Sequence, residues 1–344
     1  MNTRFIARRW IFLMIAFACH LVTSPGLAGA RDDSTTDSLV LREDRAIGLN
    51  EKPPLGWVAA VAVDSKGNVY LLDASYMIIR KYSQEGEYIG DLGGQGEGPG
   101  MFYQATCMAI GPADRLYVAG ISTIVTIIES DGTPVGQLKR DLATPALSIA
   151  VDANGNVYVV CLDIFEQKVI HKYDALTHKR VKSFCDSYAA GTDTDTRFES
   201  MFAGGYIDID TGSDSLIFFA QRAPQRVKIF NLRGELLASH DARLNESHPG
   251  PGGEYIENGV KFNMPATSTC MLALGNGEFL TSLLFPGDRD DRRYIVDVYN
   301  GDGRRVATMS GSGLFFPLYC DAQGRIYVTE TRNDIPVVVR YHRM

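Results

Sequence analysis

The chain has 344 residues, of which 45% are hydrophobic and 22% charged, and its formal net charge is −7. An acidic chain of this kind is a poor candidate for binding phosphate backbones or anionic lipid by bulk charge, so we expect no nucleic-acid partner. Beyond residue 30, no segment reaches the roughly eighteen consecutive apolar residues of a membrane span, so we expect no membrane insertion of the mature protein.

Residues 1–30 have the pattern of a secretory signal peptide. Three arginines form a basic head, residues 10–22 are an apolar run, and Ala28, Gly29 and Ala30 supply a small-x-small cleavage site. The run is shorter than the roughly twenty residues that a membrane span needs. Export to the periplasm or the extracellular space with cleavage after Ala30 is therefore the preferred interpretation, and retention as an uncleaved anchor is the alternative.

Residues 61–102 predict four short strands joined by three turns and closed by a glycine-rich connector. The turns contain Asp, Asn and Gly, which tolerate left-handed conformations, and the flanking runs are rich in Val, Ile, Tyr and Leu. The turn and its following strand recur six times, at residues 63–70, 110–117, 151–158, 209–218, 274–279 and 320–327. Small antiparallel sheets expose both faces, so repeated copies stack around an axis. We expect an all-β, six-bladed β-propeller with four-stranded blades over residues 31–344.

Two features depart from the repeat. Residues 186–200 and 245–258 are polar insertions that we expect to form loops. The sixth copy ends after its third strand, which would leave an open sheet edge. Residues 38–49 are strand-like and belong to no repeat, so we predict that they supply the outer strand of blade six and close the ring.

The first unit carries a resemblance to a known family. Its "AVD…GNVY…D" core and "GGQGEGPGMF" tail, within residues 61–102, resemble the NHL repeat, and residues 146–173 match less fully. The resemblance implies a bacterial exported six-bladed propeller with NHL-like blades. Propellers of this type include binding scaffolds and some enzymes, so the resemblance leaves the function open. The glycine-rich residues 93–100 lack the spacing of a nucleotide-binding loop and are interpreted as a connector between blades.

The predicted mature chain keeps an odd number of cysteines, so at least one is unpaired. Cys107, Cys270 and Cys320 lie in apolar strand patterns, where a free cysteine behaves as a small hydrophobe. Cys161 and Cys185 fall in the same repeat and are the only pair that we consider as a candidate disulfide.

Metal chemistry finds little support in the residue pattern. The resemblance extends to a peptide-amidating lyase that holds a metal with histidines from several blades. The histidines of the predicted mature chain are His171, His178, His240, His248 and His342. They lie in or beside turns or in third strands rather than in inner strands, so the metal site of that lyase is not carried over. Asp193 and Asp195 could help to bind calcium, but a solvated loop is the simpler interpretation. We predict no cofactor; a divalent cation (Ca or Zn) belongs only to the alternative function below.

One face of the predicted propeller collects the inner-strand starts and the ends of the second strands. Aromatic walls with a few convergent charges suit a ligand or peptide site, although a generic polar rim is the alternative. Asp73, Asp163 and Glu330 would favour a cationic or hydroxylated partner. The candidate residues are Trp57, Asp73, Tyr76, Tyr103, Asp163, Tyr206, Arg222, Glu330 and Arg332.

The preferred hypothesis is a monomeric exported scaffold that binds a protein, peptide or glycan at this face without catalysis. The first alternative is a metal-dependent hydrolase or lyase with a divalent ion in the central channel. A structural subunit of an envelope complex is the second alternative.

Overall fold

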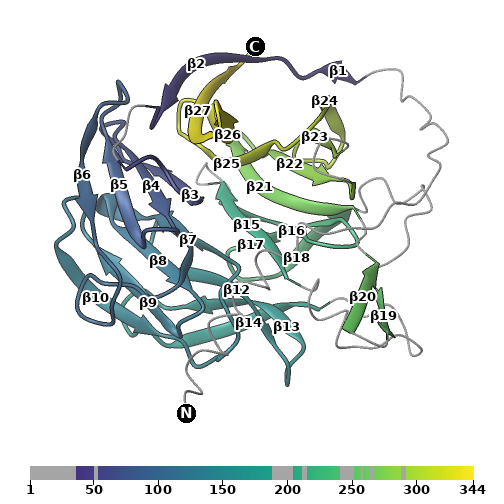
Figure 1. Cartoon of the computed structure of the whole chain (residues 1–344). Helices are drawn as coiled ribbons and strands as arrows, with labels where there is room; N and C mark the ends of the chain where they lie inside the picture. Colours follow the sequence, from purple (N-terminus) through teal and green to yellow (C-terminus); the bar gives the residue numbers. More distant parts are fainter. Residues whose placement is uncertain are drawn as a thin grey trace.

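The structure is a computed structural model in which the strands form a ring of sheets (Figure 1). It describes residues 36–49, 53–187, 204–210, 215–240, 252–256, 259–263, 266–287 and 292–344. The expected signal peptide, with the cleavage site at Ala30, lies outside the described residues. So do Asp193, Asp195 and most of the first predicted insertion.

Six antiparallel four-stranded blades follow one another along the chain. Blade one consists of β3 (Val58–Val63), β4 (Val69–Asp73), β5 (Ile78–Tyr82) and β6 (Tyr88–Leu92). Blade two consists of β7 (Ala105–Ile110), β8 (Leu116–Gly120), β9 (Ile124–Ile128) and β10 (Pro134–Lys139). Blade three consists of β11 (Ser148–Val151), β12 (Val157–Asp163), β13 (Lys168–Tyr173) and β14 (Arg180–Asp186). Blade four consists of β15 (Gly205–Asp210), β16 (Leu216–Gln221), β17 (Arg226–Asn231) and β18 (Leu236–His240). The short 3-10 turn η2 (Pro112–Asp114) joins β7 to β8.

The last two blades also use strands from the N-terminal segment. Blade five is β21 (Thr267–Gly275), β22 (Glu278–Leu284), β23 (Arg293–Tyr299), β24 (Arg305–Ser312), with β1 (Asp37–Ser38) added in parallel to β24. Blade six is β25 (Phe316–Cys320), β26 (Arg325–Arg332), β27 (Ile335–Arg343), and its outermost strand is β2 (Leu41–Ile47), antiparallel to β27. The prediction of an all-β six-bladed propeller closed by an N-terminal strand is confirmed.

One part of the second predicted insertion is not a loop. Within it β19 (Gly252–Ile256) pairs with β20 (Gly259–Asn263) to form a two-stranded antiparallel sheet of its own (Figure 1). The prolines and glycines before this hairpin are loop-forming residues, but the alternating Val260 and Phe262 of its second strand are typical of a strand. The loop prediction over residues 245–258 was therefore wrong for residues 252–256.

In blades one, three and six the recurring turn motif is explained by one aspartate. Asp64 accepts hydrogen bonds from the backbone N–H groups of Lys66 and Asn68, at 3.0 and 2.8 Å, and from the hydroxyl of Tyr70 at 2.9 Å. The carboxylate thus satisfies the donors of a tight turn and fixes the first buried aromatic of the next strand. The same Asp–Tyr hydrogen bond recurs in blade three from Tyr158 to Asp152 and in blade six from Tyr327 to Asp321.

A second repeated device joins neighbouring blades, and we call it the junction clamp. The hydroxyl of Tyr70 and the ammonium of Lys81, which face each other across β4 and β5, both donate to the carbonyl of Ser130 in blade two. The ammonium also lies 5.2 Å from the centre of the Tyr70 ring, within range of a cation–π interaction. One side-chain pair therefore stabilises its own turn and binds the next blade.

The complete junction clamp recurs at one other junction, and its cation alone recurs at a second. In blade three, Tyr158 and Lys172 both donate to the carbonyl of Leu232 in blade four. In blade six, Arg340 faces Tyr327 and donates to the carbonyl of Gln84 in blade one, so the closing junction of the ring uses the same position.

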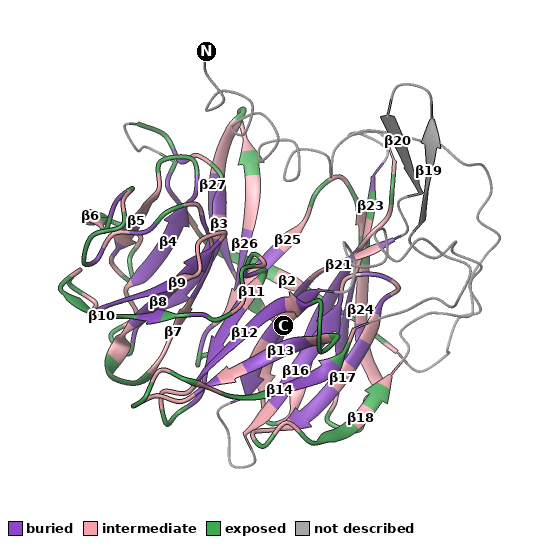
Figure 2. Cartoon of the chain, turned by 90° about the horizontal axis from the view of Figure 1, so that it is seen from below, coloured by how far each residue is buried: buried purple, intermediate pink, exposed green. Residues whose placement is uncertain are grey.

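The core lies between the blades. Among the described residues there are six buried hydrophobic clusters, one at each junction between consecutive blades, including blade six against blade one. Buried residues follow the strands of the ring, while exposed residues gather on loops and outer strands (Figure 2). The loops are thus held on a rigid frame, which is the usual arrangement for a binding surface.

Candidate functional site

The turns between second and third strands, together with the connectors between blades, lie at one face of the ring, because successive antiparallel strands reverse direction. We call it the loop face. Its described turns are residues 74–77, 121–123, 164–167, 222–225 and 333–334, and its connectors include residues 53–57, 93–104 and 140–147.

Large apolar side chains are exposed on the loop face along blades one to three. Trp57 is 49% exposed and Phe165 is 89% exposed, and the set comprises Trp57, Tyr76, Tyr103, Leu147, Ile164 and Phe165. They occupy successive turns and connectors of three neighbouring blades. Single exposed hydrophobic residues are ordinary, but a group gathered on one arc is typical of an interaction surface.

The turn that carries Tyr76 is held in place by Asp73. This carboxylate is fully buried, accepts the backbone N–H of Gly56 at 2.9 Å and that of Ser75 at 3.2 Å, and forms an ion pair with Arg80 at 3.2 Å. The guanidinium of Arg80 lies 5.1 Å from the centre of the Tyr76 ring. Asp73 therefore acts through its neighbours, as a positioning residue for Tyr76.

Asp163 occupies the same position in blade three, at the end of the second strand, and likewise holds the turn that follows it. It accepts the backbone N–H groups of Phe165 and Glu166 at 2.9 and 3.0 Å and pairs with Arg180 at 3.0 Å. Burial works to raise the pKa of Asp163, but these hydrogen bonds and the Arg180 charge hold that pKa below its usual value. The carboxylate is thus ionised at neutral pH and fixes the turn that displays Ile164 and Phe165.

Glu330 and Arg332 belong to the closure of the ring. Arg332 donates to both carboxylate oxygens of Glu43 in β2, at 2.9 and 2.8 Å, and pairs with Glu330 at 3.1 Å. Tyr341 donates its hydroxyl to Glu330. These contacts tie the N-terminal strand to blade six.

The remaining candidate residues divide by exposure. Tyr103 is 41% exposed on the connector before β7, while Tyr206 packs against the core between blades four and five. The backbone of Arg222 bonds to Gly204 and Ser268. The structure thus places Trp57, Tyr76 and Tyr103 at the loop face and gives all three predicted acids intramolecular partners. A role of these residues in ligand binding stays a prediction.

The described histidines, cysteines and acids do not form a metal site. Among the described residues, no three His, Cys, Asp or Glu side chains come together in a way that could hold a metal ion. His171 is buried, and its ring nitrogens lie 3.0 Å from the Cys161 carbonyl oxygen and from the Ser183 hydroxyl. Cys161 and Cys185 are both free, so the considered disulfide is not formed.

The sequence analysis missed Asp208, a carboxyl on the inner strand β15. Its carboxylate accepts the backbone N–H of Ala273 in the next blade's inner strand at 2.8 Å and that of Ile209, and it has no ion pair among the described residues. Burial, with a smaller contribution from Asp210, raises the pKa of Asp208 to about 6. The signal in the sequence was a charged residue within the apolar inner-strand pattern at residues 205–210.

The raised pKa of Asp208 should make the stability of the protein depend on pH. Its folded pKa of about 6 exceeds the ordinary 3.8, so ionising it costs folding free energy as the pH rises through this range. Asp208→Asn should therefore be more stable than the parent at pH 7.5, by at most about 3 kcal/mol, with the gain vanishing near pH 4. Urea unfolding across this pH range measures the difference. A gain or loss that is independent of pH would contradict the prediction.

Comparison with known proteins defines the class. No family model and no curated protein matches the sequence. A member of the DUF4221 family from Bacteroides vulgatus is similar in structure, with a TM-score of 0.66 and 12% identity, covering 90% of this chain and 99% of that one. A candidate exported protein from Bacteroides fragilis has a TM-score of 0.56 and 9% identity, covering 91% and 98%. A streptogramin B lyase has a TM-score of 0.50 and 12% identity, covering 89% and 98%.

At these identities the likeness shows the fold alone. The protein is a six-bladed β-propeller, and the NHL-like pattern of its first blade is compatible with that class, although no family model confirms it. In the part of the chain that is described, no helix is long and apolar enough to cross a membrane.

Proposed function

We propose that this protein is an exported binding protein that recognises a protein or peptide partner on its loop face. The observation that supports the proposal is the set of exposed apolar side chains along blades one to three, which includes Trp57, Tyr76 and Phe165. Aromatic residues are enriched at the centres of protein interfaces, where a few of them dominate the binding free energy.

The local geometry favours binding at this face. Asp73 with Arg80 and Asp163 with Arg180 fix the two turns that carry Tyr76 and Phe165. A side chain held in one place before binding loses less conformational entropy when the partner arrives. Aliphatic Leu147 and Ile164 lie along the same arc, and this mixture suits a protein surface better than a glycan.

Export is supported by the pattern of residues 1–30 and by the similarity to a candidate exported protein. The alternative, a metal-dependent hydrolase or lyase, has no described cluster of ligands to support it. A stoichiometric divalent ion in the purified protein, with an activity that disappears on its removal, would favour that alternative over ours.

The proposal is tested by comparing two exposed side chains of the same blade. Phe165 lies on the loop face, whereas Leu176, 92% exposed, lies in the turn between β13 and β14 on the opposite face. We expect Phe165→Ser to weaken binding of the partner captured by the unmodified protein by roughly tenfold or more. Leu176→Ser should leave that affinity unchanged. Titration of the captured partner against both variants measures this, and equal affinities for the two would refute the loop face as the binding surface.

A further inference from the structure

The junction between blades two and three lacks the junction clamp. Ile127 faces Tyr117 at the position where Lys81 faces Tyr70 in blade one. Gly111 stands where Asp64 begins the corresponding turn, so the Tyr117 hydroxyl has lost its acceptor as well. The facing turn of blade three is also longer: it is closed between Asp174 and Lys179, whereas that of blade one is closed between Ser83 and Glu87.

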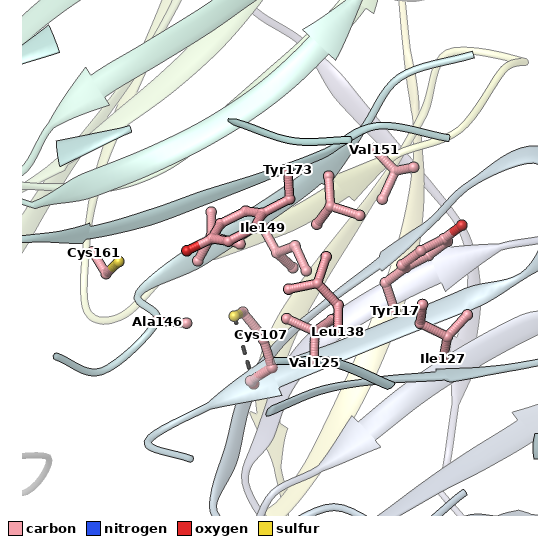
Figure 3. Packing of buried hydrophobic residues seen from close by; sticks show 13 residues of the cluster. Cys107, Tyr117, Val125, Ile127, Leu138, Ala146, Ile149, Val151, Cys161 and Tyr173 are labelled. Carbon is pink, nitrogen blue, oxygen red and sulfur yellow. Dashed lines mark hydrogen bonds between the residues drawn. The ribbon is translucent and has the colours of Figure 1, made fainter. Parts of the chain in front are cut away.

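A cavity of about 70 Å³ occupies the place of the missing clamp. Its lining includes Arg115, Tyr117, Ile127, Ala175 and His178. In Figure 3 the ring of Tyr117 lies beside Ile127 at the edge of the core cluster, with its hydroxyl at the end remote from Cys107. The volume is several times the ~10–15 Å³ that one water molecule requires, so a small ligand fits.

Three polar side chains of the lining have donors to spare. Tyr117 is only 6% exposed, and its hydroxyl has no hydrogen-bond partner among the described residues. Arg115 uses its Nε to bond Glu129 at 3.1 Å, and within the described chain its terminal nitrogens bond nothing further. The ring of His178 is likewise without a hydrogen bond in this part of the chain. Burial raises the pKa of Tyr117, so the hydroxyl stays protonated and available as a donor.

The charge of the lining decides the class of ligand. The equivalent position in blades one and three holds a lysine ammonium, but an aspartate accompanies the tyrosine in those blades. Here no carboxylate lines the cavity, and the one cationic side chain of the described lining is Arg115, which is paired through its Nε with Glu129. A guanidinium presents a fork of donors that matches the oxygens of a carboxylate or phosphate.

We propose that the cavity between blades two and three binds a small oxyanion of carboxylate or phosphate size through Arg115, Tyr117 and His178. The site lies at the face opposite the loop face, so it is separate from the proposed partner surface. An anion held there would bridge β8 and the turn of blade three, the connection that the junction clamp makes elsewhere.

Calorimetric titration of the purified protein tests the proposal, with sodium phosphate and sodium acetate as probes and sodium chloride at equal ionic strength as reference. We expect saturable binding of one or both oxyanions; phosphate alone would assign a phosphate site and acetate alone a carboxylate site. Arg115→Gln should raise the Kd roughly tenfold or more, and Tyr117→Phe roughly two- to tenfold. Glu129→Gln should lower the Kd, because it frees the guanidinium.

The matched control is Arg233→Gln. Arg233 also lies on this face, pairs with Glu235 at 3.0 Å and is 79% exposed, but it does not line the cavity. Its substitution should leave the Kd unchanged. The proposal is overturned if neither oxyanion binds, if sodium chloride gives the same saturable heats as the oxyanions, or if Arg115→Gln and Arg233→Gln have the same effect.

Discussion

Asp73→Ala is expected to destabilise the propeller by about 3–5 kcal/mol, because it leaves the Arg80 guanidinium buried without its counter-charge. The side chain of Arg80 is 3% exposed and that of Asp73 is fully buried. The variant also removes the acceptor for the N–H groups of Gly56 and Ser75. Urea unfolding at neutral pH measures the loss.

The control for this prediction is the same substitution two blades further on. Asp163→Ala should cost less, about 1–2 kcal/mol, because Arg180 is 21% exposed and keeps its ion pair with Asp141 at 2.9 Å. The double variant Asp73→Ala with Arg80→Met should recover part of the stability lost by the single variant, since no unpaired charge remains. Equal losses at the two aspartates, or no recovery in the double variant, would show that burial of the charge is not the cause.

The ion pairs of Asp73 with Arg80 and of Asp163 with Arg180 indicate that these two acids position loop-face turns rather than contact a partner. A loss of partner binding in Asp73→Ala would act through the turn that carries Tyr76 rather than through direct contact of the carboxylate. Tyr76 is 45% exposed and outside the core clusters, so substituting it tests the loop face without a comparable change in stability.

The fold was predictable because its signals are local. The hydrogen bonds that define each blade's first turn join residues within one short stretch, as from Asp64 to Tyr70, so the repeat is visible in the sequence. The exposure of Trp57, Tyr76 and Tyr103 also follows from their positions between strands. The missing outer strand of blade six was recognisable because the repeat itself is incomplete there.

The partners of the candidate residues were not predictable, because they come from distant segments. Arg332 meets Glu43 across nearly the whole length of the chain, and Asp208 meets Ala273 from another blade. No local pattern encodes such contacts. The junction between blades two and three is an intermediate case, since Ile127 at the position of Lys81 becomes informative only after the register of the strands is known.

The N-terminal segment should be indispensable for a closed ring. Leu39 is buried in the cluster between blades five and six, and Ile47 in the cluster between blades six and one, so the segment fastens two junctions. Its Glu43 and Asp44 also pair with Arg332 and Arg340. Deletion of residues 36–47 would remove these contacts and expose the edge of β27, which invites pairing with other chains. We expect the truncated protein to aggregate or to lose cooperative unfolding.

A point substitution measures the same contribution in a chain that still folds. Ile47→Ala should cost about 2–5 kcal/mol, because a fully buried side chain is removed from a packed junction. Val40→Ala is the matched control: Val40 belongs to the same segment but is 51% exposed, so its substitution should change stability by less than about 0.5 kcal/mol. Chemical unfolding of the two variants and size-exclusion chromatography of the truncated chain give the comparison. If the truncated chain were monomeric and unfolded at the parent's urea midpoint, the N-terminal segment would contribute nothing to the stability of the ring, and the prediction would be wrong.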